Sequence, residues 1–394
     1  MNIYVTKKIS PKKYQISYLD VLQNRQLNFD TRNYHFTKTE IVDNSLLKGA
    51  KYTRIRNQLL LCLKEFNFIY ENLIAVQDKQ ELYHSFDIAK GSKVPEKALA
   101  KKKYKKKFRH IDAPNEELKR ALRNLKGIFE FRFKVNYHSS AYAYVKHRKT
   151  LDLVTRHQKN ESMWFLKLDF SDFFGSISQE FLESQLSMIY PFSLLMEDEE
   201  AKTELHKTLS LCFLNNKLPQ GTPISPMLTN ILMIPIDYKI SSELRNKFGK
   251  VVYTRYADDM CISHQNEFNY KKVISLIEEV LREFNAPLKL NEDKTHYGNR
   301  NGKNFILGIQ LNKDNNMTIG HVRKKELKTA LFCFLRDHFN GERWSLHEVQ
   351  ILNGKIAYGL DIEKEAVNEI VQNYSKKFNC NVIELIKKYL KEEI

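Results

Sequence analysis

The most constraining stretch of the chain is Val251–Ser263, which reads VVYTRYADDMCIS. Two short apolar, β-prone runs, Val251–Tyr253 and Met260–Ile262, flank a polar centre that carries two adjacent acids. This pattern predicts a β-hairpin that displays Asp258 and Asp259 at its turn. Because Asp is common in turns, the acid pair alone fits an ordinary turn as well as a functional site.

The composition indicates a folded chain with a polyanionic partner. Its 394 residues are enough for two or three packed subdomains. The 64 Lys and Arg residues exceed the 47 Asp and Glu residues, and the net charge of +17 fits nucleic acid or an anionic membrane surface. Because no run of 18 apolar residues occurs, we expect no membrane-spanning helix and no membrane partner.

The N-terminus and the cysteines both favour a cytoplasmic location. The first residues, MNIYVTKKIS, contain no apolar signal core, so we do not expect secretion. The five scattered cysteines include no CxxC pair, which is typical of small buried groups in a reducing compartment. We therefore expect neither a disulfide framework nor a zinc site.

Strand-like and helical patterns alternate through the middle of the chain and predict an α+β sheet domain. Trp164–Phe170 is a mostly apolar strand, and residues 178–214 follow a helical pattern that breaks near Pro191. Ser225, followed by proline, marks the start of a helix that Pro235 is expected to kink or end.

Beyond Met317 the apolar residues recur at helical spacing, which predicts a separate all-α module of about 75 residues. Within it, Ser345 and Glu348 form the sequence pattern of a capping box at the start of a helix.

A basic run, KALAKKKYKKKFR, occupies Lys97–Arg109. Such a run is often a solvated or disordered stretch, and it also suits an element that lies over a phosphate backbone. On the second interpretation the nucleic-acid contacts would come from six lysines: Lys101, Lys102, Lys103, Lys105, Lys106 and Lys107.

A third acid, Asp169, ends the strand pattern Trp164–Phe170. Transfer of a nucleotide uses two divalent cations that bridge the attacking hydroxyl and the leaving pyrophosphate. Mg²⁺ prefers carboxylate oxygens and keeps several waters, so two or three aspartates are enough to hold it. If Asp169 and Asp258 meet across a sheet edge, they provide this arrangement; their spacing in the sequence does not establish it alone.

Several segments together resemble the ordered motifs of reverse transcriptases, with the closest fit to the bacterial retron, group II intron and abortive-infection or defence-associated lineages. FLKLDFSDFFGSI, LPQGTPISPMLTN and YTRYADD match the central motifs, and LNEDKTHY and NFILGIQLN follow in family order. FRHIDAPNEELKRAL is similar to the fingers motif, and LNGKIAYGL to the thumb helix. The resemblance covers about residues 100–360 and implies an RNA-directed DNA polymerase.

The resemblance implies a role for each matched residue. Asp169 and Asp258 would hold two Mg²⁺ ions, with Mn²⁺ as a substitute, Asp259 would complete the carboxylate cluster, and the Phe170 carbonyl would add a ligand. Lys294 corresponds to the lysine that protonates the departing pyrophosphate; taken alone it fits a surface lysine.

The incoming deoxynucleotide (dNTP) would be bound by Phe170 and by four further residues. Phe174, five residues after Asp169, falls at the steric-gate position, where an aromatic ring excludes a 2′-hydroxyl. Gln220 and Gly221 would border the nucleotide, with glycine allowing close approach of the backbone. Arg109 would clamp the triphosphate.

The family fold implied is a right-hand polymerase with fingers, an α+β palm and a helical thumb. We expect an N-terminal extension over 1–95, fingers over 96–165, a palm over 166–316 and a thumb over 317–394. The helical residues 178–217 would be a finger-like insertion within the palm.

Two departures favour a stand-alone defence-type enzyme over a typical retron. Where retron enzymes carry Asn-Ala-x-x-His, this chain keeps only His157, and Ile306-Leu307-Gly308 replaces Val-Thr-Gly. The maturase and endonuclease domains of intron-encoded enzymes are also not expected, because the chain ends soon after the palm.

The function expected from the resemblance is copying of a structured non-coding RNA into cDNA, giving an RNA–DNA duplex, in antiphage defence. Untemplated or protein-primed DNA synthesis, RNA-directed RNA synthesis and a catalytically idle RNA-binding scaffold remain alternatives. A homo-oligomer or a second protein of the defence operon is a further candidate partner.

Overall fold

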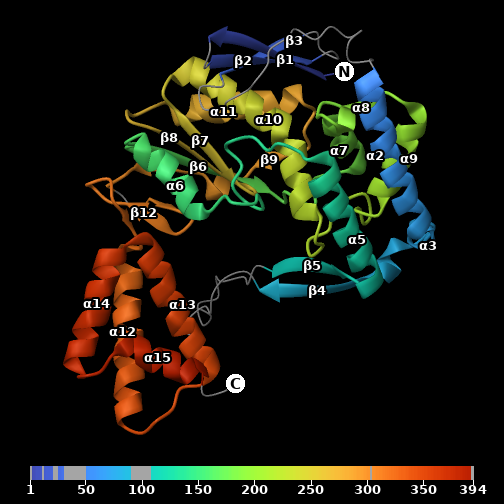
Figure 1. The fold of residues 1–394 in the computed structure, drawn as a ribbon. Helices are drawn as coiled ribbons and strands as arrows, with labels where there is room; N and C mark the ends of the chain where they lie inside the picture. Colours follow the sequence, from blue (N-terminus) through green and yellow to red (C-terminus); the bar gives the residue numbers. More distant parts are fainter. Residues whose placement is uncertain are drawn as a thin grey trace. The chain divides into compact units, whose positions relative to one another are not determined.

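A computed structural model describes residues 2–10, 13–20, 25–30, 50–89, 108–301 and 304–391 (Figure 1). The lysines predicted to bind nucleic acid, from Lys101 to Lys107, lie outside these residues. The chain divides into two compact units. The first contains 1–147, 167–260 and 269–295, and the second contains 148–166, 261–268 and 296–394.

The first unit begins with an antiparallel three-stranded sheet and two helices. Strands β1, β2 and β3 pair in that order, and the long helix α2 is followed by the short α3. A 3₁₀ turn, η1, then leads into the hairpin β4–β5, in which Asp87 lies opposite His110. The bounds are β1 Asn2–Ser10, β2 Lys13–Asp20, β3 Arg25–Asp30, α2 Ala50–Ile69, α3 Glu71–Ile74, η1 Lys79–Leu82, β4 Tyr83–Ala89 and β5 Phe108–Pro114.

Helices of the first unit follow the predicted patterns. Asn115 caps α5 through its side chain, and the apolar face of α5 is buried. The predicted break near Pro191 is confirmed, because the segment forms three helices and not one. The bounds are α5 Glu116–Ile128, the π-helical turn η2 Phe129–Phe133, α7 Gln179–Leu186, α8 Phe192–Met196 and α9 Glu199–Ser210.

The central sheet has the strand order β10-β6-β8-β7, and β9 pairs antiparallel with β6. Strands β7 and β8 form the predicted hairpin, and helices α10 and α11 pack against each other beside it (Figure 1). This mixture of sheet and helices confirms the α+β prediction. The bounds are β6 Trp164–Ser171, α10 Ser225–Phe248, β7 Val252–Tyr256, β8 Asp259–His264, α11 Tyr270–Glu283, β9 Lys289–Leu290, η3 Glu292–Lys294 and β10 His296–Asn299.

Helix α10 excludes one of the two effects predicted for Pro235, because it continues through that residue to Phe248 and does not end there. A proline inside a helix removes one hydrogen bond and costs about 3 kcal/mol. Residues Met227–Ile236 are buried on every side of the helix. Burial of each large apolar side chain contributes about 1.5–3 kcal/mol, so the packing of this segment exceeds the cost of the proline.

An ion pair lies in the interior of the first unit, where neither side chain reaches solvent. Arg255 of β7 and Asp237 of α10 are both 0% exposed, and Arg255 Nη2 lies 2.7 Å from Asp237 Oδ2. Arg255 Nε also donates to the same carboxylate, and the Tyr253 hydroxyl donates to Asp237 Oδ1 at 2.7 Å. Although burial opposes its charge, Asp237 raises the pKa of Arg255 above its ordinary value. Arg255 therefore stays charged.

The second unit contains helix α6, a small three-stranded sheet and four C-terminal helices. Ser345 and Glu348 form both hydrogen bonds of the predicted capping box of α13. The C-terminal helices enclose their own apolar core around Leu331, Phe334 and Ile356. The bounds are α6 Thr150–Lys159, β11 Phe305–Ile306, β12 Ile309–Leu311, β13 Met317–Thr318, α12 Gly320–Phe339, α13 Leu346–Ile362, α14 Lys364–Lys377 and α15 Val382–Lys391.

The second unit contains His157, which the chain shares with the retron pattern, and the segment that replaces Val-Thr-Gly. His157 is completely buried, and its Nδ1 lies 2.6 Å from the Ser263 hydroxyl. Burial lowers the pKa of His157 to about 3, so the ring is neutral and structural. Ile306-Leu307-Gly308 turns from β11 to β12, and the Gly308 carbonyl accepts a hydrogen bond from Arg323.

Across the described part of the chain, no helix has the length and apolar character needed to cross a membrane.

We predict that Asp237→Ala destabilises the fold by about 3–5 kcal/mol, because it leaves the Arg255 charge buried without a partner. Urea unfolding followed by circular dichroism measures the change. As a control, Lys202→Ala removes an exposed partner of Glu199 and should leave the unfolding midpoint almost unchanged. Equal stabilities for Asp237→Ala and the wild-type chain would contradict this account of the core.

Candidate active site

The structure brings three aspartates together in the first unit. Asp169 lies near the end of β6, and Asp258 and Asp259 lie at the turn between β7 and β8. The Phe170 amide donates to the Asp258 carbonyl at 3.3 Å, and the Asp169 carboxylate lies close enough to Asp259 to raise the pKa of that carboxyl. The sheet therefore sets the catalytic turn, Ala257–Asp259, against the end of β6.

Arg255 fixes the backbone of the catalytic turn through a hydrogen bond. Arg255 Nη1 donates to the Ala257 carbonyl at 3.0 Å and to Asn230 Oδ1 at 3.1 Å. Ala257 has a φ of 55°, a left-handed conformation that costs a non-glycine residue about 1–3 kcal/mol and persists only where neighbours impose it. The guanidinium thus fixes the residue immediately before Asp258.

Burial and the neighbouring negative charges make ionisation of Asp258 and Asp259 less favourable. Burial, and then the nearby Asp169 charge, raise the pKa of Asp258 above its ordinary value. Burial and the charges of Asp258 and Asp169 raise the pKa of Asp259 to about 6. At neutral pH the cluster therefore holds more negative charge than its surroundings compensate, which favours binding of a cation.

Lys294 supplies part of that compensation. It ends the turn η3, and its Nζ donates to Asp169 Oδ1 at 2.7 Å. The amide of Asn291, just before the turn, donates to the Asp169 carbonyl at 2.8 Å and so fixes η3 beside β6. Burial alone would lower the pKa of Lys294, but the Asp169 carboxylate raises it above its ordinary value. Lys294 is therefore an ammonium group that can donate a proton.

The three carboxylates fit an open site for divalent cations. Among the described residues, no three His, Cys, Asp or Glu side chains are arranged to enclose a metal ion. Lys294 already donates to one oxygen of Asp169. Magnesium in phosphoryl-transfer sites is held by one or two carboxylates together with waters and substrate phosphates, so a closed cage is not required.

Two of the predicted nucleotide-binding residues lie on the loop before α10, which is joined to β5. The Asp112 amide donates to the Gln220 carbonyl at 2.7 Å. Gly221 has a φ of 127°, and a Cβ there would lie 2.7 Å from the Asp112 carbonyl oxygen. Glycine is therefore required at this position by the approach of β5, and not only by a nucleotide as predicted.

The other predicted nucleotide-binding residues lie around the carboxylates. Arg109 is exposed on β5, and its charge helps to lower the pKa of Asp258 against the stronger opposing effect of burial. Phe174 follows β6, is partly exposed, and packs edge-to-face on Phe173 with ring centroids 5.8 Å apart. Phe170 is buried next to the Asp258 carbonyl. Their roles toward a nucleotide stay predictions.

Sequence reasoning missed Arg255 and Asp237. The available signal was an arginine in the apolar strand VVYTRY and an aspartate in the apolar helix that follows Ser225. Charged residues are almost never fully buried unless they are paired, so each indicated that a partner of opposite charge lies somewhere in the core.

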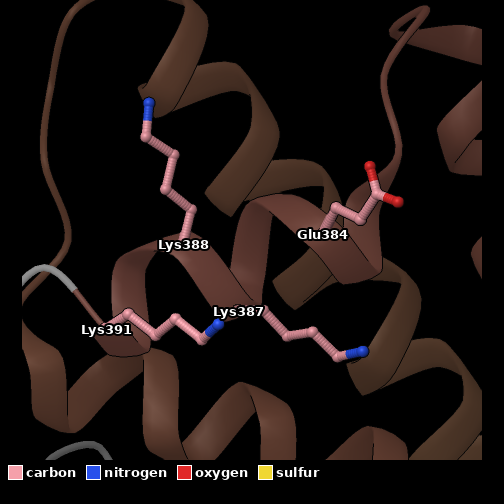
Figure 2. Close-up of a pocket in the computed structure, with 4 residues that line it drawn as sticks. All are labelled: Glu384, Lys387, Lys388 and Lys391. Atoms are coloured by element: carbon pink, nitrogen blue, oxygen red, sulfur yellow. The ribbon is translucent and has the colours of Figure 1, made fainter.

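A surface cavity of about 380 Å³ lies elsewhere, on α15 of the second unit. Figure 2 shows its lining residues, Glu384, Lys387, Lys388 and Lys391, and the Lys388 side chain points away from that of Lys387. All four project from one helix without converging, and none is a predicted site residue. The cavity is not a candidate active site.

These aspartates, with the paired lysine and the loop before α10, lie within the part of the chain that matches a known family. The family model for reverse transcriptase (RNA-dependent DNA polymerase) matches residues 99–311, more than half of the chain. The chain therefore belongs to the reverse transcriptase family and is an RNA-directed DNA polymerase.

Individual relatives are retron reverse transcriptases of Escherichia coli. The chain is 27% identical to retron Ec83 reverse transcriptase over 334 residues, which are 79% of this chain and 96% of the relative. It is 26% identical to retron Ec73 reverse transcriptase over 61% of this chain and 75% of the relative. The chain is therefore similar to retron reverse transcriptases.

Among solved structures, the chain is similar to telomerase from Candida albicans in complex with a fragment of telomeric RNA. The similarity has a TM-score of 0.42 at 12% identity and covers 82% of this chain and 68% of the telomerase chain.

We predict that Asp259→Asn raises the melting temperature at pH 8 in the presence of EDTA, because it removes one of three repelling charges. The raised pKa means that the Asp259 charge destabilises the folded state above about pH 6. Below about pH 4 the carboxyl is protonated in both folded and unfolded chains, so the gain should disappear as the pH falls from 6 to 4.

Differential scanning fluorimetry across pH 4–8 measures this gain. Glu278→Gln, which neutralises an exposed acid on α11, is the matched control and should show no such pH-dependent gain. A lower melting temperature for Asp259→Asn at pH 8 would contradict mutual repulsion within the cluster.

Proposed function

We propose that this reverse transcriptase copies a structured non-coding RNA by nucleotidyl transfer with two Mg²⁺ ions. The observation that carries the proposal is the meeting of Asp169 with Asp258 and Asp259, with Lys294 hydrogen-bonded to Asp169. The excess negative charge of these carboxylates supports a cation site. The basic composition of the chain, with its net charge of +17, supports a nucleic-acid substrate.

Each of these residues would have its own role in the reaction. Asp169 and Asp258 would hold the cations, assisted by Asp259 and the Phe170 carbonyl. When bound, the cations activate the attacking 3′-hydroxyl and neutralise the charge of the leaving group. Lys294 remains protonated beside Asp169 and would give its proton to the departing pyrophosphate.

The incoming nucleotide would be oriented by residues of the loop before α10 and of β5. Arg109 carries a permanent charge toward the triphosphate, and the β5 backbone holds Gln220 in place through the Asp112 amide. Phe174 would lie under the sugar, where its ring leaves no room for a 2′-hydroxyl.

We predict that the purified protein, given an RNA template and a DNA primer, incorporates labelled dNTPs and prefers them to ribonucleotides. Asp258→Asn should reduce incorporation by more than about 10²-fold, since it removes charge needed in the transition state. Phe174→Ala should admit ribonucleotides while dNTP incorporation continues. Gel analysis of the extended primer measures both effects.

Three outcomes would contradict the proposal. Full activity of Asp258→Asn would show that this aspartate is not needed for catalysis. A wild-type preference for ribonucleotides would favour RNA-directed RNA synthesis. A product that stays attached to denatured protein would favour protein priming. Glu278→Gln serves again as the neutral control.

We further propose that the synthesis serves antiphage defence in the cytoplasm. The resemblance to defence-associated reverse transcriptases supports this role. In the host, Asp258→Asn should abolish protection against phage. Protection that persists in this variant would favour the idle scaffold.

The exposed face of α13 fits the RNA–DNA duplex product. Gly354 lies inside the helix, where a Cβ would meet nothing within 4 Å. Glycine inside a helix costs about 1 kcal/mol relative to alanine, so the packing of the protein itself does not explain it. Ile351, Lys355 and Tyr358 lie on the same exposed face, and the Arg323 guanidinium lies 5.6 Å from the Tyr358 ring centroid. A wide, shallow minor groove could approach this face closely.

We predict that Gly354→Ala stabilises the free protein by about 0.5–1 kcal/mol and weakens its binding to an RNA–DNA duplex. Chemical denaturation and fluorescence anisotropy measure the two effects. Gly127→Ala on α5 is the matched control, because a Cβ there also meets nothing within 4 Å. The control should gain stability without losing duplex affinity. Wild-type duplex binding by Gly354→Ala would remove α13 from the interface.

A further inference from the structure

The β4–β5 hairpin has two faces with different contacts. Side chains alternate along a strand, so Arg109 and Ile111 lie on one face of β5. His110 and Asp112 lie on the other. The first face contacts the loop before α10, because a Cβ at Gly221 would lie 3.0 Å from Ile111 Cγ2. The proposed function uses this first face and assigns no role to the second.

A continuous network of polar side chains crosses the second face. The Gln80 side-chain amide donates to Ser85 Oγ at 3.1 Å, and that hydroxyl donates to Asp112 Oδ1 at 2.6 Å. His110 Nε2 lies 3.2 Å from the same oxygen, and His110 Nδ1 lies 2.9 Å from Asp87 Oδ1. In the strand register, Ser85 pairs with Asp112 and Asp87 with His110. The network therefore ties β4 to β5 at two cross-strand pairs.

Asp112 connects this network to the loop before α10 through its main chain. Its amide donates to the Gln220 carbonyl at 2.7 Å. Its carbonyl oxygen is the atom that a Cβ at Gly221 would approach to 2.7 Å. The Asp112 side chain is 16% exposed, so its contacts with Ser85 and His110 are partly shielded from salt and water. One residue thus joins the second face to both residues expected to border the nucleotide.

The arrangement holds His110 in its charged form. A carboxylate only accepts hydrogen bonds, so both ring nitrogens carry a proton when the ring donates to Asp87 of β4 and to Asp112 of β5. The hydrogen bond to Asp87, and then the charge of Asp112, raise the pKa of His110 above its ordinary value. A neutral ring has one N–H and would release one of the two carboxylates.

We propose that His110 is a positioning residue for the incoming nucleotide, which in its charged form ties Asp112 to β4 and so holds the loop before α10 in place. Loss of the proton removes one of the two bonds and loosens β5 on β4. The displacement reaches Gln220 through the Asp112 amide. The inference rests on the proposed function, which places Gln220 beside the nucleotide, and it adds a group that does not touch the nucleotide.

The contribution of His110 has a defined pH range. Because the pKa is raised in the folded chain, the tie is complete below the ordinary value of 6.5 and is lost as the pH rises through the raised pKa. The His110 side chain is 62% exposed, and exposed ion pairs make small contributions. We therefore expect a change of about threefold in the dNTP KM.

The test measures the dNTP KM and kcat of primer extension by the full chain between about pH 6 and about pH 9. At the lower pH, His110→Ala should raise KM about threefold over wild type. The ratio of the two KM values should fall toward one at the higher pH, where the wild-type ring has lost its charge. The ratio cancels the titration of the aspartates and of the nucleotide, which both proteins share. The kcat and the affinity for an RNA–DNA duplex without nucleotide should not change.

Two charge variants separate positioning from a general effect on the fold. His110→Arg keeps a permanent cation with several N–H donors, so its KM should match wild type at the lower pH and stay low at the higher pH. Asp87→Asn removes a charge that favours the imidazolium, so KM should rise at a lower pH than in wild type.

His206→Ala is the matched control. His206 Nδ1 lies 2.8 Å from Glu183 Oε1, and the His206 side chain is 60% exposed, so the pair resembles that of His110 in kind and exposure. It lies in the same unit but on α7 and α9, outside the hairpin. Its loss should leave the dNTP KM unchanged at every pH.

Three results would overturn the inference. A KM ratio for His110→Ala that stays constant with pH would show that the charge of His110 does not set nucleotide binding. A change confined to kcat would place its effect on the chemical step, and weaker duplex binding would place it on the nucleic acid. Failure of the proposed function gives a different result, because the wild-type chain then incorporates no dNTP at any pH.

Discussion

The active site depends on one buried ion pair. Arg255 and Asp237 are shielded from solvent, and the guanidinium also reaches Asn230 and the carbonyl of Ala257. A single side chain thereby joins α10 to the strained residue that precedes Asp258. An apolar side chain in place of Arg255 could fill the same volume. It could not donate a hydrogen bond to the Ala257 carbonyl, and it could not be oriented by an ion pair with Asp237. The charge is retained in the core because it specifies the position of the catalytic turn.

The ion pair holds a strained backbone at Ala257, immediately before the aspartates of the proposed catalytic centre. Three carboxylates lie closer than their charges favour, as the raised pKa values of Asp258 and Asp259 indicate, and Lys294 offsets part of the repulsion. Repulsion among these carboxylates lowers the stability of the protein alone, and the same excess negative charge favours binding of divalent cations. The same logic applies to Gly354, which lowers the stability of α13 and leaves its surface open to close approach.

Much of the site could be predicted from the sequence because its signals are local. An acid at the end of an apolar strand and an acid pair between two β-prone runs each follow from short-range patterns, and their order along the chain indicates the family. The partner of Arg255 could not be predicted, because it lies in a different element and was hidden in an apolar helix. The sequence left open whether Pro235 kinks or ends the helix, and tertiary burial of α10 outweighs the local propensity to end there.

The central claim is that Asp169, Asp258 and Asp259 form the catalytic centre of a template-directed DNA polymerase. The most direct measurement is to sequence the DNA that the purified protein makes on an RNA of known sequence, with all four dNTPs and Mg²⁺. The account predicts DNA complementary to that RNA, which is absent when Asp169 and Asp258 are both replaced by alanine. DNA whose sequence is independent of the supplied RNA, or undiminished synthesis by the double variant, would contradict it.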